Sequence, residues 1–288
     1  MAKLFKSKNP SFEYLRKKWT AKNRQSGQSL LDKHFNKIAA TSLGGLLLLS
    51  TPSASPPIDS VSADQSPTIG GEEDKNFLLK AELLDKLPKE VRSLTKEEED
   101  QISQLLSKDF GIKVAPELDG KRLNKSYGLI GGEQHLYRYP GDNIFAHAKS
   151  VQDWAMFGSS GIAPHLGAWG YFSPSKQEFS QKDEEREKYY LAVQTFLAPG
   201  FAEHVSEYRD FFKFRKMLVV NPKNGKSVVA VIADAGPAEW TGKHLGGSPE
   251  VMHELGLASG PRKGEVLYFF IDDPDDQVPL GPIKVKDI

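Results

Sequence analysis

The sequence predicts a mainly β chain whose C-terminal part, residues 127–288, forms a small β-barrel with loop insertions. Beyond residue 114, short apolar runs alternate with Gly, Pro, Asn and Asp, which is typical of strands joined by tight turns. One clear helix follows late in the chain, at 249–255, and Gly256 closes it. Many short strands with one late helix favour a small barrel. The expected strands are 127–130, 135–139, 168–172, 189–197, 216–220, 226–233 and 265–271.

The best-defined part of this barrel is a hairpin at 216–233. Its turn contains Asn224 and Gly225, a pair that tolerates positive φ. The second strand is apolar without alternation, so we expect both of its faces to be covered. Asp234 follows this strand directly. Burial at the mouth of the strand would raise the pKa of Asp234 toward that of a general acid, whereas hydrogen bonds from the next two amides would give it a structural role in the turn.

A helical segment precedes the barrel, at 76–126. Apolar residues at helical spacing stop at Pro88, and Thr95 with Glu98 forms a capping box ahead of a second apolar stripe. Such a short segment buries too little surface to fold alone, so we expect it to pack on the barrel. The acidic and basic run at 182–188 is interpreted as a solvated loop or a short exposed helix.

The charge of the chain is unevenly distributed. The 288 residues hold 38 basic and 38 acidic side chains, but residues 1–37 hold ten Lys and Arg against two acids (10 − 2 = +8), so the rest carries −8. An uncharged stretch at 38–49 follows, then small residues and Pro. This layout predicts a leader over 1–54 that acts as a signal peptide or membrane anchor, and a secreted or cell-envelope protein. The alternative is a basic amphipathic helix on a nucleic acid or a membrane surface.

Residues 55–75 are expected to be a disordered linker, because Pro, Ser, Ala, Asp and Gly are mixed there without apolar periodicity. Without the leader the chain is acidic, which argues against nucleic acid as a partner and leaves shape, hydrogen bonds and aromatic contacts for recognition. The absence of cysteine excludes disulfides, thiolate nucleophiles and Cys-ligated metal. The seven histidines show no close pair of the zinc-peptidase kind, so neither a metal nor a cofactor is predicted, and a monomer is expected.

The hairpin and the residues after it resemble a known family. The run Asn221-Pro-Lys-Asn-Gly-Lys-Ser-Val-Val-Ala-Val-Ile-Ala-Asp-Ala-Gly-Pro237, the later Thr241-Gly242, the helical run 248–256 and the strand 264–269 are similar, in that order, to the double-psi β-barrel of the rare lipoprotein A family. Related barrels occur in expansin-like proteins and in lytic transglycosylases. The resemblance, confined to the C-terminal region, implies a six-stranded double-psi β-barrel with Asp234 at the catalytic or saccharide-facing position.

The sequence departs from the family in two places. His204 is the nearest match to the family's site histidine, but the family's Leu-Pro-Phe-Gly-Thr stretch after it is replaced by 208–215. The second aspartate of the family is replaced by Gly246, so a pair of carboxylates flanking a glycosidic bond would be incomplete. The resemblance to lytic transglycosylases avoids this objection, because those enzymes use a single carboxylic acid as both acid and base.

Further candidates lie on turns and on the expected strand 135–139. Alternation would place Glu133, His135, Tyr137 and Tyr139 on one face, as a strip that suits sugar rings or is simply the wet face of an edge strand. The remaining candidates for sugar binding are Gly236, Trp240 and Trp169, and the two tryptophans would otherwise cap or fill the barrel.

The sequence therefore predicts a cell-wall protein that binds or cleaves peptidoglycan or another cell-wall polysaccharide. Asp234 is the expected general acid/base, with His204 and Glu133 as helpers. The alternative is a non-catalytic binding or scaffolding module in which Asp234 only holds its loop.

Overall fold

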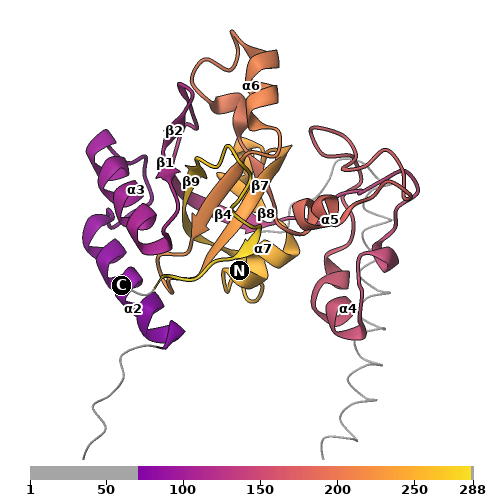
Figure 1. Cartoon of the computed structure of the whole chain (residues 1–288), viewed down its shortest axis with the longest axis horizontal. Helices are drawn as coiled ribbons and strands as arrows, with labels where there is room; N and C mark the ends of the chain where they lie inside the picture. Colours follow the sequence, from indigo (N-terminus) through magenta and orange to yellow (C-terminus); the bar gives the residue numbers. More distant parts are fainter. Residues whose placement is uncertain (1–70, 287–288) are drawn as a thin grey trace, which may run out of the picture. The chain divides into compact units, whose positions relative to one another are not determined.

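The computed structural model describes residues 71–286, which form a mixed α/β structure built around a β-barrel (Figure 1). The predicted leader, and all of the predicted linker up to residue 70, lie outside the described residues. The helices are α2 (Glu72–Lys86), α3 (Lys96–Phe110), α4 (Val151–Phe157), α5 (Gln181–Lys188), α6 (Val205–Phe212) and α7 (Pro249–Glu254). The strands are β1 (Val114–Ala115), β2 (Glu117–Leu118), β3 (Lys121–Arg122), β4 (Tyr127–Gly132), β5 (Tyr190–Val193), β6 (Lys216–Val220), β7 (Ser227–Ala235), β8 (Leu245–Gly247), β9 (Lys263–Ile271) and β10 (Gly281–Pro282).

Six of these strands close into a ring. Around the ring, β9 pairs with β4, β4 with β8, β8 with β5, β5 with β7, β7 with β6, and β6 again with β9. The β4–β8 and β5–β7 pairs are parallel, and the other four are antiparallel. The prediction of a six-stranded β-barrel in the C-terminal region is therefore confirmed, although the helices make the chain mixed α/β rather than mainly β.

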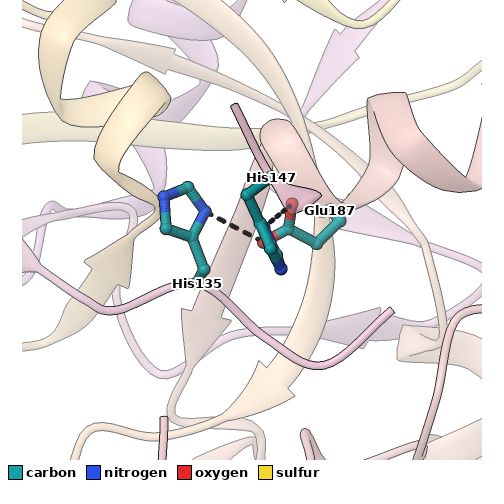
Figure 2. Close-up of side chains that lie close together, drawn as sticks. All are labelled: His135, His147 and Glu187. Atoms are coloured by element: carbon teal, nitrogen blue, oxygen red, sulfur yellow. Dashed lines mark hydrogen bonds and ion pairs between the residues drawn. The ribbon is translucent and has the colours of Figure 1, made fainter. Parts of the chain in front are cut away.

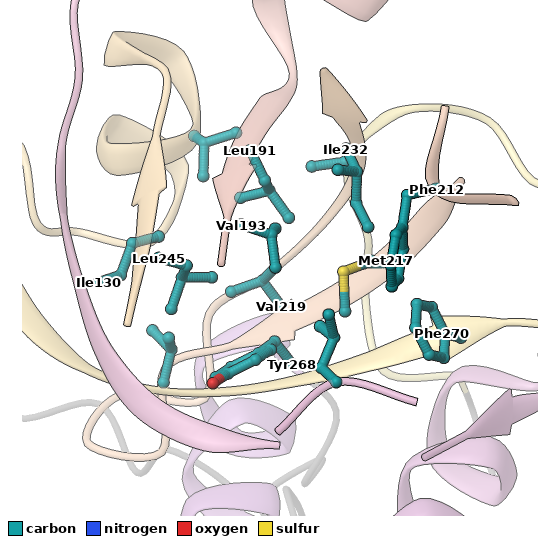
Figure 3. Close-up of a cluster of buried hydrophobic side chains, with 14 of the residues drawn as sticks. Ile130, Leu191, Val193, Phe212, Met217, Val219, Ile232, Leu245, Tyr268 and Phe270 are labelled. Carbon is teal, nitrogen blue, oxygen red and sulfur yellow. The ribbon is translucent and has the colours of Figure 1, made fainter. Parts of the chain in front are cut away.

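The barrel wall has two apolar faces, because side chains alternate along each strand. Met217 and Val219 of β6 belong to the interior cluster, whereas Leu218 and Val220 belong to the exterior one. The same alternation runs along β9, and aliphatic and aromatic side chains fill the interior (Figure 3). Strand β7 is buried from its first residue through Ala233, which confirms that both of its faces are covered.

Helices α2 and α3 cover the exterior face of the barrel. Leu79 and Leu83 of α2 and Phe110 of α3 lie in one buried cluster with β6, β7 and β9 side chains. Helix α3 begins at the capping box that the sequence predicts: the Thr95 side chain accepts from Glu98 N, and the Glu98 carboxylate accepts from Thr95 N. A strong cap fixes where this helix starts, and its apolar stripe fixes which face it buries.

The long connection between β4 and β5, residues 133–189, differs from the sequence prediction. Residues 135–139 and 168–172 are not strands; each region makes only one isolated bridge, His135 to Ile162 and Gly167 to Gly170. The connection instead contains α4, α5 and short 3-10 turns. Helix α5 is the short helix expected at 182–188, but it buries Glu187. Among the described residues, no helix is long and apolar enough to cross a membrane.

Candidate functional site

Asp234 lies at the end of β7, next to an irregularity in the ladder. The register between β5 and β7 shifts so that Leu191 is opposite Ile232 but Ala192 is opposite Asp234, which leaves Ala233 as an extra residue. Such a bulge re-aims the side chain that follows it. Oδ1 of Asp234 accepts hydrogen bonds from the amides of Ala235 and Ala168, both at 2.8 Å. Within residues 71–286, Oδ2 has no hydrogen-bond partner.

Burial raises the pKa of Asp234, and the two backbone hydrogen bonds and His165 oppose this shift without reversing it. The direction is the one expected for a carboxyl group at the mouth of an apolar strand. Of the two following amides that the turn interpretation expected on Asp234, only that of Ala235 donates to it; the Gly236 amide donates to Val193 O, and the second hydrogen bond comes from Ala168.

The aromatic candidates differ in their exposure. Trp240 is 89% exposed on the 3-10 turn Glu239–Thr241, so it caps nothing and presents its ring to solvent. Trp169 packs against the interior cluster, and its indole Nε1 donates to Arg209 O at 3.1 Å. Trp169 is also the neighbour of Ala168, whose amide holds Asp234. Gly236 donates its amide to Val193 O at 3.0 Å and precedes a cis proline in the same loop.

The two expected helpers of Asp234 are each engaged elsewhere. His204 precedes α6 with its side chain 63% exposed, and Nδ1 lies 3.8 Å from a carboxylate oxygen of Glu207. Glu133 forms an ion pair of 3.0 Å with Lys243 beside β8. No contact links either side chain to Asp234 in the part of the chain that the structure describes.

The polar and aromatic strip expected at 133–139 does not form, because these residues leave the sheet after β4. His135 and Tyr139 are buried, whereas Tyr137 is only partly so. His135 joins a different group of side chains, which the sequence did not predict.

His135, His147 and Glu187 converge inside the connection between β4 and β5 (Figure 2). One ligand atom from each lies within 4.8 Å of the others, and their side chains are 2, 4 and 2% exposed. His135 Nδ1 lies 3.2 Å from Glu187 Oε1, and His147 Nδ1 lies 3.3 Å from Glu187 Oε2. We call these three residues the histidine cluster. Two imidazoles and a carboxylate form a donor set that suits a divalent transition metal.

Two further buried side chains hold this cluster in place. Asp142 Oδ2 lies 2.9 Å from His147 Nε2, and the Arg138 guanidinium donates to both oxygens of Asp142, at 2.9 and 2.7 Å. Burial alone would lower the pKa of His147, but the interactions with Asp142 and Glu187 outweigh burial and raise it to about 9. Burial also opposes ionisation of Glu187, yet the two histidines keep its pKa below the usual value.

A cavity of about 210 Å³ borders the histidine cluster. His135, His147 and Glu250 line it, together with His253 and Asp153. Glu250, in the first turn of α7, is buried, and its Oε2 has no hydrogen-bond partner among residues 71–286. Burial, and then the negative charge of Glu187, raises the pKa of Glu250. Buried imidazole and carboxylate groups thus line a cavity large enough to hold solvent or a small ligand.

The histidine cluster could not be predicted from the sequence, because its members are far apart in the chain. His135 and His147 lie in loops, and Glu187 lies in helix α5. No short motif marks them. No protein-family model and no curated protein matches the chain.

Proposed function

We propose that the barrel is of the double-psi type and that the chain is a cell-envelope protein acting on peptidoglycan glycan strands, with Asp234 as general acid/base. The two parallel pairs in the ring support the double-psi assignment, as does the hairpin between β6 and β7 with Gly225 at a φ of 74°. The β7 end of the barrel would then be the saccharide site.

One observation carries this proposal: the two oxygens of the Asp234 carboxyl group have different surroundings. Oδ1 is fixed by two amides, whereas Oδ2 is unpaired among the described residues. Partial burial favours the protonated form at this position. A fixed carboxyl group that keeps a transferable proton is what general acid catalysis requires. The exposed ring of Trp240, on the next turn of the chain, offers an apolar surface for a sugar.

A single carboxyl group suffices for the proposed reaction. The Asp234 proton passes to the glycosidic oxygen as the bond from that oxygen to C1 breaks. The resulting carboxylate then takes the proton of the sugar's own 6-hydroxyl, and the freed oxygen forms a new bond to C1. No water is consumed, and the product is an anhydro-sugar. This reaction needs no second carboxylate. It is therefore compatible with Gly246 in β8, at the position where the rare lipoprotein A family has its second aspartate.

The test is release of soluble anhydro-muropeptides from purified peptidoglycan sacculi. Wild-type protein should release them, and Asp234→Asn should lower the rate by about 100-fold or more, the size of effect typical of a lost general acid. Asp210→Asn, an exposed carboxyl group on α6, is the control and should keep the wild-type rate. Equal release by wild type and Asp234→Asn would contradict the role of Asp234.

The alternative is a non-catalytic module that binds the polysaccharide. The two amide hydrogen bonds on Oδ1 favour it, because a carboxylate held in this way also fixes a turn. In that case wild type and Asp234→Asn would pellet equally with sacculi, and neither would release soluble fragments.

A further inference from the structure

The strongest unexplained feature outside the Asp234 loop is the histidine cluster. Its two imidazoles and one carboxylate come from three separate places in the connection between β4 and β5, yet their ligand atoms gather within 4.8 Å. The rings of His135 and His147 are 4.7 Å apart between centroids. Imidazole nitrogen and carboxylate oxygen are the ligands that Zn²⁺ and similar ions take in proteins, commonly as three protein groups with an open position.

The orientation of His147 is the one found around bound metals. Its Nε2 faces Asp142, and Arg138 in turn fixes Asp142. A carboxylate on one ring nitrogen sets the tautomer and leaves the other nitrogen as the metal ligand. In this cluster the other nitrogen is Nδ1, which points to Glu187 (Figure 2).

Unsatisfied polar atoms concentrate at the same place. Among the described residues, the buried side-chain atoms without a hydrogen-bond partner are His135 Nε2, His147 Nδ1 and Glu250 Oε2. The approach of His147 Nδ1 to Glu187, at 3.3 Å, is close but does not have the geometry of a hydrogen bond. All three residues with unpaired atoms line the cavity of about 210 Å³. Buried polar groups are nearly always paired, so three unpaired ones around one cavity call for water or an ion there. Of the three atoms, His147 Nδ1 is the one that faces Glu187.

The charge of the cluster favours a cation. An imidazole that binds a metal does so without the proton on its ligand nitrogen, so metal binding displaces the extra proton of His147. In the complex, Asp142 and Glu187 then contribute two negative charges and Arg138 one positive charge (2 − 1), so the group that surrounds the ion is anionic. We propose that His135, His147 and Glu187 bind one divalent transition-metal ion of the Zn²⁺ class, with a remaining coordination position open to the cavity beside Glu250. This site is separate from Asp234, and neither proposal depends on the other.

The test uses the full chain, freed of metal by a chelator and titrated with Zn²⁺ in a calorimeter. Wild type should bind one ion per chain. His135→Gln and Glu187→Gln should weaken binding by more than about 100-fold, and Asp142→Asn, which only positions His147, by about 10- to 100-fold. His253→Gln is the matched control, because His253 lines the same cavity without belonging to the cluster. It should bind Zn²⁺ as wild type does.

Three further measurements keep the proposal falsifiable if a variant folds poorly. X-ray absorption of the wild-type zinc complex should show imidazole nitrogens from two histidines. The Co²⁺ complex should have visible d–d bands that change when azide enters the open position. Mg²⁺ and Ca²⁺, which prefer all-oxygen ligands, should not compete at equal concentration. The proposal is overturned if wild type binds no Zn²⁺, if fewer than two histidines coordinate it, if azide leaves the Co²⁺ spectrum unchanged, or if the cluster variants bind like wild type.

Discussion

Oδ2 of Asp142 lies 2.9 Å from Nε2 of His147, and both side chains are shielded from solvent inside the connection between β4 and β5. Asp142 is also the partner of Arg138, so one carboxylate satisfies two buried cationic groups. This contact makes Asp142 the central residue of the buried network.

Asp142→Ala should therefore lower the free energy of unfolding by about 3–5 kcal/mol, because it leaves the buried Arg138 guanidinium without its carboxylate partner. Urea unfolding in the presence of a chelator measures the loss independently of metal. Asp210→Ala, on the exposed side of α6, should change stability by no more than about 0.5 kcal/mol. A cost for Asp142→Ala as small as that of the control would show that the network does not stabilise the fold.

Two adjacent leucines of α2 test the docking of the helices on the barrel. Leu83 is fully buried in the exterior cluster, whereas Leu84 is 55% exposed. Leu83→Ala should cost about 2–5 kcal/mol by urea unfolding, since it removes packed methyl groups and leaves a cavity. Leu84→Ala should stay within about 0.5 kcal/mol. Similar effects from both variants would contradict this packing.

Trp240 tests the saccharide surface without disturbing the fold. Because its ring lies in solvent, Trp240→Ala should leave the melting temperature unchanged. If sugars stack on the ring, the dissociation constant for sacculi should rise about 2- to 12-fold, which corresponds to about 0.5–1.5 kcal/mol. Phe77→Ala, an exposed aromatic on α2, is the control and should bind like wild type. Unchanged binding by Trp240→Ala would remove this residue from the proposed site.

The ion pairs of Lys216 should make the stability of the fold depend on pH in the acid range. Its ammonium lies 2.7 Å from Asp273 and 2.5 Å from Asp276, and Asp276 also pairs with Lys182. Lys182 and Lys216 lower the pKa of Asp276 to about 2. Burial would raise the pKa of Asp273, but this pKa is also lowered, because the hydrogen bond from Lys216 and those from the amides of Val278 and Gln277 outweigh the opposing effect of burial. A carboxyl group whose pKa is lower in the folded than in the unfolded state stabilises the fold at pH values above its unfolded pKa of about 4. For Asp276 this stabilisation is lost as the pH falls through about 2.

The free energy of unfolding should thus decrease between pH 4 and pH 2, and Lys216→Met should make this decrease smaller. The difference should be below about 1 kcal/mol, because Asp276 is half exposed and solvent screens the pair. Urea unfolding at several pH values measures it. The exposed Lys176→Met should keep the wild-type slope. If Lys216→Met has the same pH dependence of unfolding as wild type, the ion pairs of Lys216 do not cause the loss of stability in acid.

The sequence predicted those parts of the fold whose signals are local. The hairpin β6–β7 combines apolar strands with an Asn-Gly turn, and α3 combines a capping box with an apolar stripe. Strand β8 was missed because it is three residues long, two of them glycine, and forms only by pairing with β4 and β5. Its register depends on partners distant in sequence, which no local pattern encodes.

The candidate sites show the same difference between features that local sequence signals predict and features that depend on distant contacts. Asp234 was identified because it follows a buried strand, and its position at the end of β7 agrees with that reasoning. The alternation at 133–139 suggested a strand, but the amide of His135 bonds to Gly161 O within the connection, so the residues turn away from the sheet. Glu187 lies on a helix of mostly charged residues, where burial of one acid is set by tertiary contacts alone.

Closure of the barrel determines where new chemistry can arise in this protein. Every strand of the ring has both edges occupied, so variation is confined to the segments that link strands. The histidine cluster and its two supporting residues all come from one such segment, 133–189. Exchange of this segment for a short loop would therefore delete the buried network in one step, together with the Ala168 amide that holds Asp234.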